Sequence, residues 1–135
     1  MKKAFTLLEL IFAILILGII ASYAVPKFLH TKDSALSGTI KRDIISAQTA
    51  IQSYTLLNQK IDNISDAIIL NSNNWKIESS LKATFKDHGN DCITISVISE
   101  DGTRYFDVKI TDNSGSVCTK LRDTEKIVDT KYFLY

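Results

Sequence analysis

Residues 5–25 read FTLLELIFAILILGIIASYAV, an apolar stretch interrupted only by Thr6, Glu9, Gly18, Ser22 and Tyr23. A helix of this length is about 30 Å long at 1.5 Å per residue, which is enough to cross the hydrocarbon core of a bilayer. Lys2 and Lys3 precede the stretch and should remain in the cytoplasm by the positive-inside bias. The sequence therefore predicts one membrane-spanning helix, with everything after Val25 outside the cytoplasm.

The residues around this stretch also form a motif. The order Ala4-Phe5-Thr6-Leu7-Leu8-Glu9-Leu10, then an apolar run with Gly18, then Pro26, resembles the N-terminal signature of type IV prepilins and type II secretion pseudopilins. The resemblance implies that residues 1–4 are a leader and that a prepilin peptidase cuts between Ala4 and Phe5 on the cytoplasmic side. It also implies methylation of the new Phe5 amine. The usual residue before the cut is Gly, and Ala4 keeps a small side chain there.

Glu9 is an acid inside the predicted span. A carboxylate costs a few kcal/mol at the bilayer centre, and less near the interface, unless another group pairs with it. The resemblance implies that this partner is the Phe5 amine of a neighbouring subunit, so that the ion pair sets the axial register between subunits. The alternative is that Glu9 lies at the headgroup level and complements the N-terminus of its own helix.

Gly18 and Pro26 weaken the same part of the helix. Pro26 has no backbone donor and crowds the carbonyl of Ser22, so we expect a kink near Ser22. Gly18 lowers the helix propensity further. The resemblance implies that the segment from Gly18 to Pro26 can lose its helical structure when subunits pack in a filament. A bend where the helix leaves the membrane is the simpler alternative.

The sequence predicts that residues 26–58 form the amphipathic second half of the same helix. Apolar residues recur at intervals of three, four and seven, at Leu29, Leu36, Ile40, Ile44, Ala47, Ile51 and Tyr54. Asn58 is a plausible end of the helix. A helix from Phe5 to about Leu57 would be roughly 80 Å long, so its first half must be covered by lipid or by other subunits.

Residues 59–135 predict a small β-rich head. Apolar and polar residues alternate over 93–97 and over 106–110, and Asp101-Gly102 between them is a hairpin turn signal. We expect a third strand over 117–121 and the start of a strand at 75–77. Residues 79–86 fit a helix or a strand, and 67–70 fit a short helical or irregular loop. The predicted fold is α+β and pilin-like: one long N-terminal helix packed on a small antiparallel sheet.

The cysteines, Cys92 and Cys118, lie in this exported part, and neither has a neighbouring His to complete a metal site. An oxidising compartment favours a disulfide between them, which would contribute about 3 kcal/mol of stability. A disulfide near the C-terminus is also what the resemblance to pilins implies. A reactive or metal-binding pair is the alternative.

Composition and motifs argue against other functional classes. The formal net charge is +1, from 16 basic and 15 acidic residues, so no overall field attracts nucleic acid. The sequence has no Gly-rich phosphate loop, nucleophile elbow or His-rich metal pattern. Asp112, Asn113 and Ser114 are a weak match to a calcium loop. We therefore predict no enzymatic activity, no cofactor, no metal and no small-molecule substrate.

Two functional hypotheses follow. In the first, the chain is a structural subunit of a type IV pilus-like filament, as a pilin or as a pseudopilin of a secretion or DNA-uptake machine. Its partners are copies of itself or other pilin-like subunits, the prepilin peptidase and inner-membrane lipid. It begins in the inner membrane and ends in a periplasmic or cell-surface filament. In the alternative, a single-pass membrane protein uses a pilin-like anchor and binds a ligand with its head.

Overall fold

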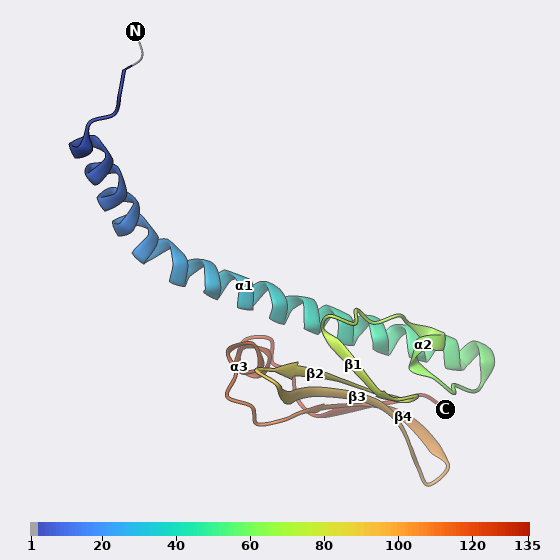
Figure 1. Cartoon of the computed structure of the whole chain (residues 1–135). Helices are drawn as coiled ribbons and strands as arrows, with labels where there is room; N and C mark the ends of the chain where they lie inside the picture. The colour runs from blue at the N-terminus through green and yellow to red at the C-terminus, as the bar shows by residue number, and fades with distance from the viewer. Residues whose placement is uncertain (1–2) are drawn as a thin grey trace. The chain divides into compact units, whose positions relative to one another are not determined.

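The structure is a computed structural model that describes residues 3–135, and it confirms the α+β class (Figure 1). Helix α1 runs from Leu7 to Asn58, which matches the predicted end at Asn58. The chain divides into two compact units, one up to Asp33 and one from Ser34 to Tyr135. Helix α1 contributes residues to both units. Met1 and Lys2, half of the predicted leader, lie outside the described residues.

The second unit contains a five-stranded antiparallel sheet in the order β1-β2-β3-β4-β5. Its strands are β1 (Trp75–Ser79), β2 (Lys82–Asp87), β3 (Asn90–Glu100), β4 (Thr103–Ile110) and β5 (Thr130–Phe133). The predicted hairpin is confirmed as β3 and β4, and Asp101 and Gly102 both have positive φ, as a tight two-residue turn requires. The ambiguous segment 79–86 is mostly strand β2.

The predicted third strand over 117–121 is wrong. These residues form helix α3 (Ser116–Asp123), in which Val117, Cys118 and Leu121 are buried. Their spacing of one, three and four is that of a helix face, although Val and Thr had favoured a strand. The neighbour of β4 is instead β5, and Cys118 therefore lies on a helix.

In the sequence, helix α2 (Ile64–Ala67) follows α1 and precedes the first strand, and it is a single turn. Asn63 and Asp66 form a capping box at its start, and the backbone is extended at Ile68. The predicted loop over 67–70 therefore begins at the end of this helix. The next segment is fixed to α1, because the Trp75 indole N–H donates to Asp43 Oδ2 at 2.9 Å.

The core lies between α1 and one face of the sheet, where α1 crosses it (Figure 1). The predicted stripe is confirmed from Ile40 to Ile51, where its side chains are at most 5% exposed, and Leu36 and Tyr54 pack at its edges. Ser37 and Thr55 are buried as well. Their hydroxyls donate to carbonyls of the same helix, at 2.9 Å to Ser34 and Ile51 respectively, so neither of these two buried donors is unpaired.

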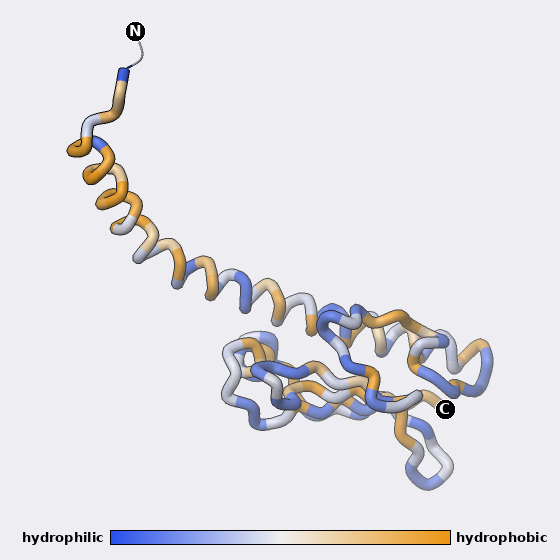
Figure 2. The backbone as a smooth tube through the Cα atoms, viewed as in Figure 1, coloured by the Kyte–Doolittle hydropathy of each residue, from blue (hydrophilic) through white to orange (hydrophobic). Residues whose placement is uncertain are grey.

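The first unit is covered by nothing within the described chain. Every residue from 3 to 32 is exposed, and the N-terminal turns of α1 are mostly apolar, drawn in orange in Figure 2. By length and composition, α1 contains one segment able to cross a membrane. The helix is continuous through Gly18 and Pro26. A loss of helical structure there remains a prediction for the assembled state.

Candidate functional site

The proposed cleavage bond lies in an open segment. Residues 3–6 precede α1 without helical structure, and Phe5 is 84% exposed. Lys3, Ala4, Phe5 and Glu9 line a concavity of about 240 Å³. The structure thus brings the two predicted cleavage residues next to the predicted register residue. An exposed, non-helical backbone is the form of substrate that a peptidase can bind.

Thr6 and Glu9 form a capping box at the start of α1. The Thr6 backbone N–H donates to Glu9 Oε2 at 3.4 Å, and the Glu9 backbone N–H donates to Thr6 Oγ1 at 3.3 Å. The Thr6 hydroxyl also lies 3.4 Å from Glu9 Oε2. In the single chain, Glu9 therefore complements its own helix N-terminus, as the local alternative expects. Sequence reasoning missed Thr6, although Thr-x-x-Glu before an apolar run is a recognised capping signal.

These capping contacts are long for hydrogen bonds between N–H and oxygen, which cluster near 2.9–3.0 Å. A protonated amine that approached Glu9 would offer a shorter, charge-assisted bond. The carboxylate is therefore satisfied in the single chain, yet it keeps accepting capacity for a stronger partner.

Gly18 and Pro26 lie on the exposed part of α1. A Cβ added at Gly18 would meet no heavy atom within 4 Å, so packing within the described chain does not explain a glycine there. Pro26 is inside the helix. Both residues remain candidates for a role that only a neighbouring molecule would reveal.

The head contains the Cys92–Cys118 disulfide. It joins β3 to α3 with a Cα–Cα separation of 5.8 Å, and both residues are fully buried. The bridge closes a segment of 26 residues in sequence. It therefore fixes α3, an element that backbone ladders do not hold, to the centre of the sheet.

A buried polar cluster supports the start of α3 from a distant strand. Asp87 is 6% exposed, and its Oδ2 accepts the backbone N–H of Cys118 at 2.9 Å. Asp87 thus caps a helix that begins 29 residues later, where its charge also suits the helix dipole. A Cβ at Gly115 would collide with the Asp87 carboxylate, so this position requires glycine. Sequence reasoning missed Asp87 because no local pattern links it to α3.

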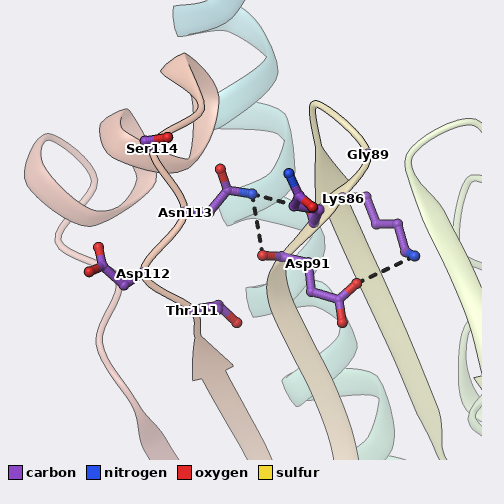
Figure 3. A pocket seen from close by; sticks show the side chains of 8 residues that line it. Lys86, Gly89, Asp91, Thr111, Asp112, Asn113 and Ser114 are labelled. Carbon is purple, nitrogen blue, oxygen red and sulfur yellow. Dashed lines mark hydrogen bonds and ion pairs between the residues drawn. The ribbon is translucent and has the colours of Figure 1, made fainter.

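A polar pocket of about 500 Å³ lies beside this cluster, between the end of β2 and residues 111–114 (Figure 3). The Asn113 amide donates to the carbonyls of Asp87, Asn90 and Asp91, at 3.1–3.3 Å. Asp91 is paired with Lys86 at 3.5 Å. Among residues 3–135, no three His, Cys, Asp or Glu side chains gather in a way that could hold a metal ion. The Asn113 amide holds the turn in place.

Comparison with known proteins finds similarity in the N-terminal segment. Residues 1–25 match the family described as the prokaryotic N-terminal methylation motif. The chain is also 37% identical over 59 residues to the type II secretion system core protein G of Klebsiella michiganensis. It is 41% identical over 57 residues to the protein of that name in Vibrio cholerae. Residues 1–25 thus carry a prokaryotic N-terminal methylation motif, and the chain is similar to type II secretion system core proteins G.

The similarity to these pseudopilins is partial. The aligned residues make up 44% of this chain and 42% of the Klebsiella protein, and 42% and 39% in the Vibrio comparison. The chain thus spans less than half the length of the curated relatives it matches. No solved structure matches it. The similarity to known proteins therefore rests on the methylation motif and these partial matches.

Proposed function

We propose that this chain is a structural subunit of a pseudopilus-like filament, assembled through the first half of α1. The observation that carries the proposal is the exposed, almost wholly apolar surface of α1 over residues 7–25, which lies within the N-terminal methylation motif and includes the acid Glu9. Such a surface needs lipid before assembly and other subunits after it. The name of the relatives favours a secretion pseudopilus over a DNA-uptake filament.

The four predicted regions acquire distinct roles in this proposal. Residues 1–4 are the leader that the prepilin peptidase removes, and 5–25 cross the inner membrane with the head outside the cytoplasm. Residues 26–58 connect the span to the head and supply its helical core. Residues 59–135 complete the head, which would face the periplasm and carry no catalytic role.

The assembly step follows from charge. Removal of residues 1–4 creates an ammonium at Phe5, which stays protonated at neutral pH when methylated. Glu9 of a neighbouring subunit would exchange its long capping contacts for this cation. In a dry bundle a misplaced charge costs several kcal/mol, so only one axial register pairs all the charges. The Gly18–Pro26 segment would then unwind as subunits pack.

The test is to isolate sheared filaments from cells that express the chain with a prepilin peptidase and to measure the intact subunit mass. We expect a chain that begins at Phe5 and carries one methyl group. Ala4→Gly restores the usual residue before the cut and should be processed at least as well, whereas the bulky Ala4→Leu should leave the precursor in the membrane.

The alternative function, a membrane-anchored binding protein, predicts a different outcome. Its chain would be found only as monomers in the membrane fraction, and Ala4→Leu would not change its distribution. An exported chain that retains the residues before Phe5 would also contradict the filament proposal.

A further inference from the structure

Tyr23 and Lys27 stand one helical turn apart at the end of the apolar run. Lys27 Nζ lies 5.8 Å from the centroid of the Tyr23 ring, and Tyr23 is 72% exposed. The pair is separated from Glu9 by residues 10–22, none of which is ionisable, and cationic side chains resume at Lys27 and Lys32. The transition from apolar to cationic sequence therefore occurs at this pair.

The chemistry of the pair suits the boundary of a bilayer. Tyrosine has an apolar ring and a polar tip, and it is enriched at both membrane interfaces. Lysine can bury its methylene chain beside apolar groups while its ammonium reaches the headgroups. A cation stacked on the ring keeps both polar tips on one face of the helix.

We propose that Tyr23 and Lys27 form an anchor that binds phospholipid headgroups of the outer leaflet of the inner membrane. In this arrangement the Lys27 ammonium and the Tyr23 hydroxyl bind lipid phosphates. The anchor rests on the proposed function only in that α1 must span the membrane with the head exported. It adds a contact with lipid that sets how deep the helix sits.

The depth of Glu9 follows from this anchor. Glu9 precedes Tyr23 by fourteen residues (9 to 23), which is about 21 Å along a helix. With Tyr23 at the outer edge of a hydrocarbon core about 30 Å thick, Glu9 lies roughly 9 Å inside its inner edge. The acid is then held below the cytoplasmic surface, where its capping box with Thr6 reduces the cost of burial. Leaving the membrane for a filament would require the Lys27–phosphate contact to break.

The alternative partner for this pair is another subunit, against which Tyr23 would pack only after assembly. The two ideas differ in the unassembled state. A lipid anchor holds residue 23 at the headgroup level in isolated chains, whereas a subunit contact leaves its depth undefined until a filament forms.

The experiment uses the full chain in phospholipid vesicles, with Tyr23→Trp as the depth reporter and the wild-type Trp75 signal subtracted. Lipids are brominated either near the headgroup end of the acyl chain or near its terminal methyl. We expect the shallow bromines to quench the introduced indole about twofold more strongly than the deep ones, because interfacial aromatics sit at the headgroup level. Ile16→Trp, in the middle of the run, should show the opposite order.

Removing the cation supplies the decisive variant. Tyr23→Trp with Lys27→Leu should let the helix slide inward and make quenching by the deep bromines dominant. Lys32→Leu removes a cation outside the pair and should leave the quenching pattern of the Tyr23→Trp reporter unchanged. The anchor would be overturned if, with Lys27 present, the deep bromines quenched the Tyr23→Trp reporter as strongly as the shallow ones or more strongly. It would also be overturned if Lys27→Leu left the quenching pattern of this reporter unchanged. If the wild-type chain does not float with the vesicles, the membrane-spanning segment fails as well, which is a separate result.

Discussion

The two halves of α1 differ in how their apolar residues are arranged, and this decides what covers them. Residues 7–25 are apolar all round, and every one of them is exposed in the single chain. Residues 34–58 confine their buried apolar side chains to one stripe, of which Ile40 and Ile51 are fully buried against the sheet. A stripe matches one sheet face, whereas an all-round apolar surface requires lipid or several neighbouring chains.

The comparison teaches that one helix can serve two independent purposes. Mutations in the first half should change assembly and leave the head intact, and mutations in the second half or the sheet should change the stability of the head. Trp75 is buried at the start of β1, so its fluorescence reports on unfolding of the head in the full detergent-solubilised chain.

The largest loss of stability is expected for Phe106→Ala, with Phe12→Ala as its matched control in the first half of α1. Phe106 is fully buried and Phe12 is 58% exposed. Loss of the buried ring should lower the free energy of unfolding by about 3–5 kcal/mol, and loss of the exposed ring should leave it unchanged. Denaturant titration followed by Trp75 fluorescence measures both. A destabilisation by Phe12→Ala of similar size would break the comparison, because the two halves would then be coupled.

The disulfide should come next in size. Replacing both Cys92 and Cys118 by Ala should lower the stability of the head by about 3 kcal/mol, since the bridge constrains the unfolded chain. The same titration with a reductant should reproduce this loss in the wild type and have no effect on the double variant. Equal stability of oxidised and reduced wild type would show that α3 does not depend on the bridge.

The third prediction compares the same substitution at a glycine in the head, Gly115→Ala, and at a glycine in the first half of α1, Gly18→Ala. At Gly115 the added methyl collides with Asp87, so we expect a loss of about 1–3 kcal/mol in head stability. At Gly18 the methyl meets open space, and the head should be unaffected. Thermal unfolding of both variants measures the difference, and an unchanged midpoint for Gly115→Ala would contradict the proposed contact.

The smallest effect concerns pH. A hydrogen bond from Lys82, with the two charged atoms 3.0 Å apart, lowers the pKa of Glu78 below its ordinary value of 4.5. A lowered folded-state pKa adds stability above the unfolded pKa, and this stability is lost as the pH falls through the folded pKa. Wild type should therefore have a slightly higher melting temperature than Glu78→Gln at about pH 6, and this difference should narrow as the pH falls below 4.5. A gap that widens on acidification would reverse the assigned sign.

Local patterns predicted the parts of the fold that local chemistry determines. The buried stripe from Ile40 to Ile51 and the hairpin at Asp101-Gly102 have clear periods and turn residues, and both were confirmed. Helix α3 escaped prediction because a carboxylate far back in the chain, on Asp87, caps it and a disulfide holds it. Strand β5 has only four residues and forms by pairing with β4.

The candidate site was predicted differently, from a motif of fixed spacing. The motif supplied Ala4, Phe5 and Glu9, and the structure places them around one concavity. The roles proposed for them involve a peptidase and neighbouring subunits, so a single chain cannot display them. What the single chain adds is the resting partner of Glu9, the Thr6 capping box.

The most direct test of the account compares the filament yield of wild type and Glu9→Ala, normalised to the chain in the membrane fraction of the same cells. Without Glu9, each added subunit buries an unpaired Phe5 amine, so we expect at least about a tenfold loss of filaments. Membrane levels and head stability should stay normal. Glu9→Gln should be nearly as defective, because an amide cannot neutralise an ammonium, and Glu78→Gln, a surface acid in the head, should assemble normally. A wild-type yield of filaments from Glu9→Ala would contradict the central claim that this acid sets the register of assembly.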